Sequence, residues 1–314
     1  MANKSKTYTI LILVIIGLVF LGIGCTEKGP SPAANTSATG APAENATAAG
    51  TSQNASSGGT QSISVKGSDT ILPVAQAEAE TFMDESANAG KSISVTGGGS
   101  GVGIAALIDK QVDIATASRE INVKETENAN KNGVNPVEYT IAYDGITAIV
   151  NPKNPVSNLT FAQLSGIYTG NISNWKDVGG EDKPIAVISR DSSSGTYAYF
   201  KEAVLNNSEY RPDALTQTAT GSIVSEVSQN PNAIGYIGFA YLDSSVKALS
   251  LDKGNGSVPP SIDNIKSGKY PLSRALYMYT NGEATGLKKE FIDYILSEKG
   301  QGVVTTVGYI PLPK

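Results

Sequence analysis

Ser62-Ile63-Ser64-Val65-Lys66-Gly67-Ser68-Asp69-Thr70 alternates apolar and polar residues in the manner of a half-buried strand, then turns through glycine and hydroxyl side chains. Apolar residues with helical spacing follow it, and the same strand–turn–helix pattern returns at residues 92–108 and 185–205. Each turn points free backbone N–H groups, hydroxyls and a helix dipole at one place, which attracts an anion. If the three places converge, the sequence predicts a site for a tetrahedral oxyanion.

The composition excludes several kinds of chemistry. The chain has 314 residues, no His and one Cys, so it cannot use a His general base, a His metal ligand, a Cys–His pair or an internal disulfide. The net charge of −5 argues against nucleic acid as a partner. We expect no cofactor and no metal, but a small anion held by local dipoles and one or two of the few Arg residues.

Two processing signals stand at the N-terminus. Lys4 and Lys6 precede an uninterrupted apolar run at residues 10–23, which suits a signal-peptide core and is short for a membrane span. Small residues before Cys25 resemble a lipoprotein processing box, although the usual leucine stands one place further out, at Leu21. We predict a signal peptide at residues 1–24 and a lipid anchor at Cys25. This places the protein at the extracellular face of the cytoplasmic membrane; an uncleaved N-terminal anchor is the alternative.

Residues 25–61 are typical of a linker. They are rich in Ala, Thr, Ser, Gly, Asn and Pro and offer too little apolar surface to fold. Asn35, Asn45 and Asn54 each begin an Asn-x-Ser/Thr sequon, a pattern that also arises by chance in such a composition. The folded part is therefore expected from residue 62 to residue 314.

This folded part alternates short β-branched runs with helical patterns, which predicts an α/β fold. The elements expected after the first two copies of the pattern are a strand at 112–117, a helix at 123–130, a long strand at 137–150, a second block at 160–273 that holds the third copy, a strand at 275–280, a helix at 287–296 and a tail at 308–311. We expect Asp144-Gly145 to interrupt the long strand. The sequence does not say where the tail packs.

Motifs in the order of one known family cover almost all of the folded part. They are Gly67-Ser68-Asp69-Thr70, Gly97-Gly98-Gly99-Ser100-Gly101, Asp113-Ile114-Ala115 with Ser118-Arg119, Asp144-Gly145-Ile146, Asn151-Pro152 with Asn154-Pro155, Asn174-Trp175, Arg190 with Ser194-Gly195-Thr196, and Gly308-Tyr309-Ile310-Pro311. With these residues the chain resembles the phosphate-binding protein of the phosphate ABC importer, a receptor of the periplasmic-binding-protein type. No single motif is decisive, but together they are highly specific.

The resemblance implies a type II periplasmic-binding-protein fold, in which two α/β lobes are joined by two crossing strands. Lobe 1 is then residues 62–145 plus 275–314, and lobe 2 is residues 146–274. Ligand would bind in the cleft between the lobes and be trapped by hinge bending. The implied protein is a monomer and not an enzyme; it captures inorganic phosphate and delivers it to the ABC permease subunits in the membrane.

Two helix starts of lobe 1 offer phosphate ligands on this interpretation. Thr70 supplies a hydroxyl and an N–H group, Ile71 supplies its N–H group, and Ser68 is a weaker candidate; a simple N-cap is the alternative. Ser100 begins the second helix among glycines, which let backbone approach a ligand closely. That loop is not a phosphate loop, since no Gly-Lys-Ser/Thr follows, and not a dinucleotide fingerprint, since Val102 breaks the pattern.

Further donors are expected from a strand end and from the third copy. Ser118 and Arg119 end a strand at its carboxyl edge, where α/β sheets bind ligands, and Arg119 either touches the anion or pairs with a carboxylate across the cleft. Arg190 presents a planar fork suited to phosphate oxygens, with hydroxyl and N–H groups of Ser194-Gly195-Thr196 beside it. A surface ion pair is the alternative for Arg190. Its orienting partner is open, because Ser192 stands where the family often has Asp.

Selectivity for phosphate needs a hydrogen-bond acceptor. Sulfate carries no proton at neutral pH whereas phosphate does, so a carboxylate accepts a hydrogen bond from phosphate and repels sulfate. Asp144, Asp69 and Asp113 are the candidates. We favour Asp144, which lies at the expected cleft, and expect Asp113 to pair structurally.

Three other functions stay open at this point. A receptor of the same fold for sulfate, molybdate or tungstate would not need the acceptor carboxylate. A serine hydrolase built on Ser100 or Ser194 would need a His or a Gly-x-Ser-x-Gly setting, and the chain has neither at these residues. A phosphate sensor without a role in transport would have the same fold.

Overall fold

The computed structural model of the chain describes residues 61–313. The predicted signal peptide, the lipid anchor at Cys25 and all but the last residue of the predicted linker lie outside these residues, so they stay predictions. Within the described part, no helix combines the length and the apolar character needed to cross a membrane.

Strands and helices alternate along the described residues, as the sequence predicts for an α/β fold. The strands are β1 (Gln61–Gly67), β2 (Lys91–Thr96), β3 (Ile114–Ala117), β4 (Pro136–Val150), β5 (Asn158–Thr160), β6 (Ala186–Arg190), β7 (Leu215–Gln217), β8 (Ala233–Gly238), β9 (Lys247–Ala248), β10 (Ser250–Asp252), β11 (Ser257–Val258) and β12 (Ser273–Asn281). The helices are α1 (Leu72–Met83), α2 (Ser100–Ile108), α3 (Val123–Lys131), α4 (Phe161–Thr169), α5 (Gly195–Ala203), α6 (Thr220–Gln229), α7 (Ile262–Lys266), α8 (Gly286–Leu296) and α9 (Glu298–Thr306). Short 3₁₀ turns lie at η1 (Ser86–Asn88), η2 (Trp175–Val178) and η3 (Phe239–Tyr241).

Most of these strands join one sheet in the order β2-β1-β3-β12-β4-β8-β6-β7, with β9 also paired to β4. β1 runs parallel to both β2 and β3, which confirms the two strand–helix–strand units predicted at the start of the fold. β6 is likewise parallel to β7 and β8. Because the carboxyl ends of parallel strands share an edge, the turns that follow β1, β2 and β3 are brought to one edge of the sheet.

The long strand β4 connects two halves of the sheet. Its residues 136–145 pair with β12, and its residues 146–150 pair with β8. The predicted interruption at Asp144-Gly145 is wrong, because β4 runs through both residues without a break. Gly145 is needed for packing and not for a turn: a Cβ there would lie 2.5 Å from Cδ1 of Ile265.

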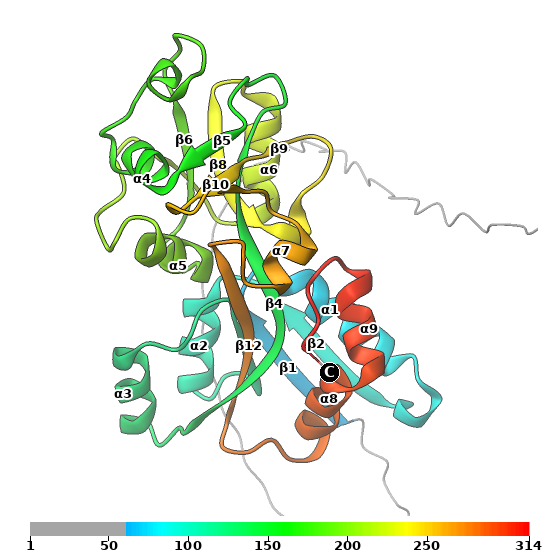
Figure 1. The fold of residues 1–314 in the computed structure, drawn as a ribbon. Coiled ribbons are helices and arrows are strands. Elements are labelled where there is room, and N and C mark those ends of the chain that lie inside the picture. The colour runs from blue at the N-terminus through cyan, green and yellow to red at the C-terminus, as the bar shows by residue number, and fades with distance from the viewer. Residues whose placement is uncertain (1–60, 314) are drawn as a thin grey trace, which may run out of the picture. The chain divides into compact units, whose positions relative to one another are not determined.

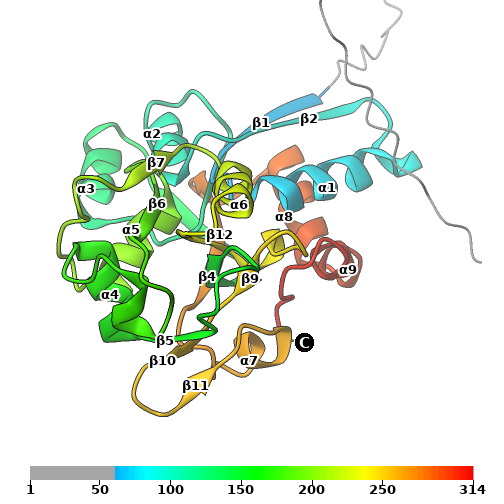
Figure 2. The ribbon, with the colours of Figure 1, turned by 90° about the horizontal axis from the view of Figure 1, so that it is seen from above.

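The described residues form two lobes on either side of this change of partner (Figures 1 and 2). The first lobe, as named here, contains β1–β3, residues 136–145 of β4, β12, α1–α3, α8 and α9. Its sheet has one core under α1, α8 and α9, around Phe82 and Phe291, and another under α2, around Ile104. The second lobe contains residues 146–150 of β4 and the elements from β5 to α7, with cores around Phe200 and around Ile223.

The C-terminal tail touches both lobes. Tyr309 is buried in the core of the first lobe, while the next residue, Ile310, is buried in the core of the second. The backbone of Ile310 exchanges two hydrogen bonds with Tyr143 of β4, at 2.8 and 3.1 Å. The tail therefore fastens the lobes together beside the crossing strands, a place that the sequence did not reveal.

Candidate anion site between the lobes

The starts of α1, α2 and α5 meet at the boundary between the lobes. The hydroxyl oxygens of Thr70, before α1, and Thr196, in the first turn of α5, lie 2.9 Å apart. Gly195 packs so tightly against Ser100 and Ser118 that a Cβ on it would lie 2.7 Å from Oγ of Ser118 and nearer still to Oγ of Ser100. The three turns singled out in the sequence are thus brought together, two from the first lobe and one from the second.

Buried hydroxyls connect the two turns of the first lobe. The Ser68 hydroxyl donates to Oγ of Ser118 at 3.0 Å, and the Ser118 N–H donates to Oγ of Ser100 at 3.0 Å. The cause is local: β3 ends one residue before Ser118, and the Ser68 N–H bonds the carbonyl of Thr116 near the end of β3 at 3.0 Å. All three serines are buried, so their hydroxyls are fixed in a small polar pocket of the interior.

The remaining predicted donors divide between the site and the surrounding core. Ser194 is the N-cap of α5, where its Oγ accepts the Tyr197 N–H at 3.3 Å. By contrast, the N–H of Ile71 is already bonded to the carbonyl of Ser68 at 3.1 Å, and the Ile71 side chain lies in the first-lobe core. Ile71 therefore closes the turn that presents Thr70. The Thr70 carbonyl in turn accepts a hydrogen bond from the hydroxyl of Tyr309 in the tail.

Arg190 is buried at the end of β6 and reaches across to the first lobe. Its Nη2 lies 3.0 Å from Oδ2 of Asp69, and its Nη1 donates to the Thr220 hydroxyl at 2.8 Å. The carboxylate that orients Arg190 is therefore Asp69. Asp191, although adjacent to Arg190 in sequence, instead accepts the N–H of Ser193 at 2.8 Å. Arg190 Nε is buried and has no hydrogen-bond partner among the described residues. Such a donor is costly to leave unpaired, so it points to a ligand for this guanidinium.

A second buried arginine, Arg274, was missed as a site residue. Its Nη2 donates to Oδ2 of Asp144 at 2.9 Å and to Oγ1 of Thr196 at 3.0 Å, while Nη1 donates to the Ser118 carbonyl at 2.9 Å. In the β4–β12 ladder Arg274 stands directly opposite Asp144. Both strands were predicted, but only their register brings these residues together, and the sequence does not carry that register.

The candidate acceptors occupy different surroundings. Asp144 is buried, and its Oδ1 accepts the Phe239 N–H at 3.0 Å while its Oδ2 accepts from Arg274. Asp69 accepts the Gly98 N–H at 3.0 Å in addition to Arg190. Asp113 lies apart from both, where its Oδ2 accepts the N–H of Ser64 on β1 at 2.8 Å.

Arg119 is held within its own lobe. Both of its terminal nitrogens donate to the carboxylate of Glu125 on α3, at 2.7 and 2.8 Å. Glu125 also accepts the N–H of Asn122 in the capping box of α3, so the helix start fixes the carboxylate that holds Arg119. Pairing with a carboxylate across the cleft, one of the two alternatives predicted for Arg119, is therefore not what the structure has.

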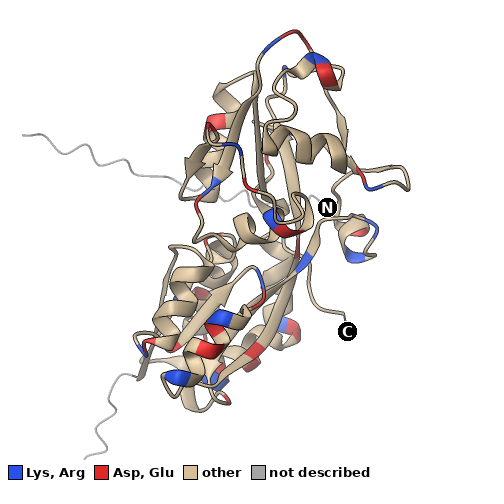
Figure 3. Cartoon of the chain, turned by 90° about the vertical axis from the view of Figure 1, so that its left-hand side faces the viewer, with Lys and Arg blue, Asp and Glu red and all other residues tan. Residues whose placement is uncertain are grey.

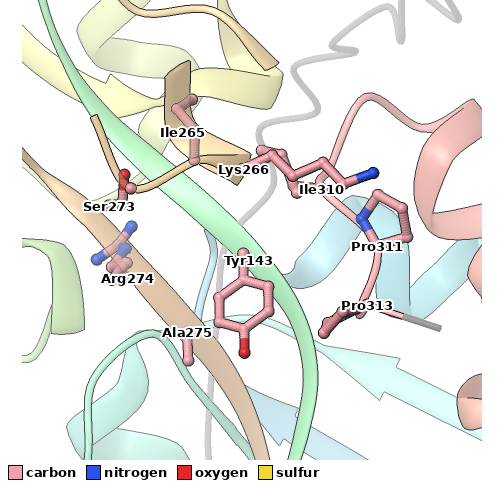
Figure 4. Close-up of a pocket in the computed structure, with 10 residues that line it drawn as sticks. Tyr143, Ile265, Lys266, Ser273, Arg274, Ala275, Ile310, Pro311 and Pro313 are labelled. Atoms are coloured by element: carbon pink, nitrogen blue, oxygen red, sulfur yellow. The ribbon is translucent and has the colours of Figure 1, made fainter. Parts of the chain in front are cut away.

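Tyr241 of η3 adds one more contact between the lobes, because its hydroxyl donates to the Asp69 carbonyl at 2.5 Å. Burial raises the pKa of Tyr241, so the hydroxyl keeps the proton it donates. Beside the helix starts, a cavity of about 680 Å³ separates the lobes and is bordered by Arg119, Tyr197 and Arg274. A second cavity, of about 430 Å³, lies at the crossing strands between Tyr143 and Lys266 (Figure 4).

The charges of the site cancel in pairs. Arg190 with Asp69 and Arg274 with Asp144 are both buried or nearly so. Figure 3 shows Lys and Arg interspersed with Asp and Glu over both lobes. No group of acidic, Cys or His residues able to hold a metal ion occurs in the described part of the chain. The arrangement can therefore bind an anion through N–H groups, hydroxyls and helix ends.

Comparison with known proteins gives the family of the chain. A family model described as the PBP superfamily domain matches residues 33–299, which is most of the chain. The chain belongs to the PBP superfamily. Within it, the chain is 34% identical to the phosphate-binding protein PstS of Bacillus subtilis, over 98% of this chain and 95% of that protein.

Solved structures of the superfamily confirm the fold. A phosphate ABC transporter substrate-binding protein with bound phosphate from Clostridium perfringens is 38% identical, covers 81% of this chain and 100% of its own, and gives a TM-score of 0.74. An ABC-type phosphate transport receptor from Vibrio cholerae is 34% identical, covers 80% of this chain and 100% of its own, and gives a TM-score of 0.65. The predicted resemblance and the predicted two-lobe α/β fold are both confirmed for this PBP-superfamily chain.

Proposed function

We propose that this chain captures inorganic phosphate between its lobes and delivers it to an ABC importer in the membrane. The observation that carries the proposal is the meeting of three helix starts, two from one lobe and one from the other, at Thr70, Ser100 and Gly195. Relatives named for phosphate binding and transport support the same ligand.

The chemistry of these groups suits a tetrahedral oxyanion. Helix starts leave backbone N–H groups without partners, and their dipoles favour negative charge. Charge-assisted hydrogen bonds contribute on the order of 1.5–3 kcal/mol each, so a few of them reach the roughly −8 kcal/mol of micromolar binding after the costs of dehydration and closure. We propose as phosphate ligands the residues predicted from the sequence, except Ile71 and Arg119, whose donors are already engaged by protein groups. The proposed ligands are Ser68, Thr70, Ser100, Ser118, Asp144, Arg190, Ser194, Gly195 and Thr196.

Asp144 stays our proposed acceptor for the phosphate proton, and Asp69 is the second candidate. Oδ1 of Asp144 accepts one N–H and so keeps a lone pair for a ligand. Replacing Asp144 with Asn should narrow the ratio of phosphate to sulfate affinity, and the Asp69→Asn variant tells the two carboxylates apart. If the ratio of phosphate to sulfate affinity is unchanged in Asp144→Asn but changed in Asp69→Asn, Asp69 is the acceptor for the phosphate proton.

Titration calorimetry of the full-length protein with phosphate, sulfate and molybdate tests the ligand. We expect phosphate to bind with a Kd of about 1 μM or tighter, and sulfate and molybdate about a hundredfold more weakly. Equal or stronger binding of sulfate or molybdate refutes the choice of phosphate in favour of another oxyanion.

The finer parts of the proposal concern place and motion. We propose a monomer held at the extracellular face of the membrane through Cys25, with residues 62–145 plus 273–314 moving against residues 146–272. The boundary predicted at residue 274 moves by two residues, because Ser273 and Arg274 pair with Gly145 and Asp144 of β4. The change of partner within β4, between Gly145 and Ile146, supports this division. Mass spectrometry of the N-terminus from the membrane fraction separates a lipid-modified Cys25 from an uncleaved apolar segment.

A further inference from the structure

Arg274 occupies a particular place at the crossing strands. It lies at the start of β12, where the chain leaves the second lobe, directly opposite Asp144 near the change of partner in β4. The guanidinium is only 2% exposed and the carboxylate 1%. A buried cross-strand ion pair is thus built into the two strands that join the lobes (Figure 4 shows Arg274 on β12 beside β4).

The Arg274 guanidinium contacts both lobes at once. Nη1 donates to the carbonyl of Ser118 in the first lobe, and Nη2 donates to the hydroxyl of Thr196 in the second. Together with two bonds to Asp144, these contacts use four of its five N–H groups. Arg190 differs, because its buried Nε is without a partner in the described residues. Arg274 is therefore placed to hold protein groups and not the anion.

We propose that Arg274 is a positioning residue that fixes the proton of the Thr196 hydroxyl toward the ligand; this inference rests on the proposed function. A hydroxyl has one proton to donate and two lone pairs. Because Arg274 donates to Thr196 Oγ1, it occupies one lone pair and turns the Thr196 proton away from itself, toward the anion site. The Thr70 hydroxyl, 2.9 Å away, can donate to the second lone pair and so leaves the Thr196 proton for the ligand.

This arrangement also makes the direction of the Thr196 hydroxyl proton depend on closure of the lobes. Asp144 and Ser118 stay with Arg274 when the lobes separate, because Asp144 is its cross-strand partner and Ser118 belongs to the first lobe. Thr196 arrives with the second lobe. The hydroxyl is therefore oriented only when the lobes are closed, so closure itself completes the donor set. Lys cannot replace Arg here, since one ammonium nitrogen cannot match the fork that reaches Asp144, Ser118 and Thr196 together.

The test is a double-mutant cycle on phosphate affinity, measured by calorimetry on the full-length protein. Arg274→Lys keeps the charge and Thr196→Val keeps the shape, and each should weaken phosphate by about 10- to 100-fold, the range for a hydrogen bond to a charged group. The double variant should bind phosphate as well as the single variant that has the lower phosphate affinity. Thr196→Ser retains the hydroxyl and should bind within about threefold of the native protein. The matched control is Arg211→Lys, whose arginine pairs with Asp213 on the surface of the second lobe.

A second measurement does not depend on phosphate. Dyes on Asn128→Cys of α3 and on Ser208→Cys beyond α5, in a Cys25→Ser background, report the distance between the lobes by energy transfer. Arg274→Lys should shift ligand-free protein toward the open form, and Arg211→Lys should not.

The inference is overturned if the losses of phosphate affinity in the two single variants add up in the double variant. It is also overturned if Arg274→Lys binds phosphate with native affinity. If Arg274→Lys does not fold, Thr196→Ser decides: a loss as large as that of Thr196→Val overturns it. If the native protein does not bind phosphate at all, the proposed function fails, while an unchanged distance between the lobes in Arg274→Lys refutes the inference separately.

Discussion

Gly195 is the residue on which closure of the lobes depends most directly. It lies in the first turn of α5, has ordinary helical geometry, and faces Ser100 and Ser118 of the opposite lobe. The three atoms nearest to a methyl group at this position all belong to the opposite lobe, so Gly195→Ala should fold normally. Its effect should appear only when the two lobes come together.

The geometry sets the size of the effect. The added Cβ would lie 2.7 Å from Oγ of Ser118 and 3.0 Å from Cβ of Ser100, whereas ordinary contact begins at 3.4 Å. The contact with Cβ of Ser100, which rotating the Ser100 hydroxyl does not relieve, requires the lobes to separate by about 0.4 Å. The contact with Oγ of Ser118, which the Ser68 hydroxyl holds in place, raises the required separation to about 0.7 Å. The Thr70–Thr196 contact then lengthens from 2.9 Å to about 3.6 Å, beyond hydrogen-bonding distance.

The bond between the Gly101 N–H and the Ser193 carbonyl, also 2.9 Å, is lost by the same separation. Two lost bonds at about 1 kcal/mol each predict a loss of about 2 kcal/mol, or roughly 30-fold in phosphate affinity. The bonds of the ligand to the second lobe lengthen as well, which makes this a lower bound.

Calorimetry with phosphate, together with thermal melts without ligand, measures both consequences. The control is Gly302→Ala in α9, an exposed helical glycine with nothing within 4 Å of its added Cβ. It should keep native affinity and gain about 0.4–1 kcal/mol of stability. If Gly195→Ala binds phosphate within threefold of the native protein, the closed packing of these helix starts is not the ligand-binding state.

Three further predictions concern other parts of the fold. Burial raises the pKa of Glu78 to about 8 from an ordinary 4.5, so the folded chain keeps a proton that the unfolded chain releases. The free energy of unfolding should therefore fall by up to about 1.4 kcal/mol per pH unit from about pH 4.5 to about pH 8, and urea titrations of Glu78→Gln should lack this slope. Ile310→Ala should cost about 2–5 kcal/mol in the same titrations, because Ile310 ties the tail into the second-lobe core; a loss below 1 kcal/mol would contradict that role. Arg119→Lys should leave phosphate affinity within threefold, since Glu125 engages both terminal nitrogens of Arg119; a tenfold loss would show direct contact with the anion.

The sequence revealed the parts of the site that are local. A strand that ends in glycine and hydroxyl residues before an amphipathic run is a signal within about fifteen residues, and β1 with Thr70 and β2 with Ser100 were found in that way. The third turn, with Arg190 and Gly195, was found by the same signal.

The pairings between distant segments could not be predicted. Arg274 meets Asp144 through the register of two strands that are 130 residues apart, and Asp69 meets Arg190 through the docking of one lobe on the other. Neither strand pattern nor local propensity carries that information.

Glycine accounts for two of the errors. Asp144-Gly145 resembles a turn, but Gly145 is small because Ile265 packs against it. The helix α9 was missed because Gly300 and Gly302 weaken its pattern, although Gly300 is needed where α9 packs closely against the end of α8.

The cancellation of charge at the site has a consequence for the environment in which the protein can work. Each buried arginine is matched by an aspartate, and the chain as a whole is acidic, so an approaching anion is not drawn in by long-range attraction. Short hydrogen bonds inside a closed interior are also hidden from dissolved ions, which screen only charges that face water. The affinity for a scarce anion should therefore be nearly the same in fresh water and in brine, where abundant chloride would compete for a site built on bare positive charge.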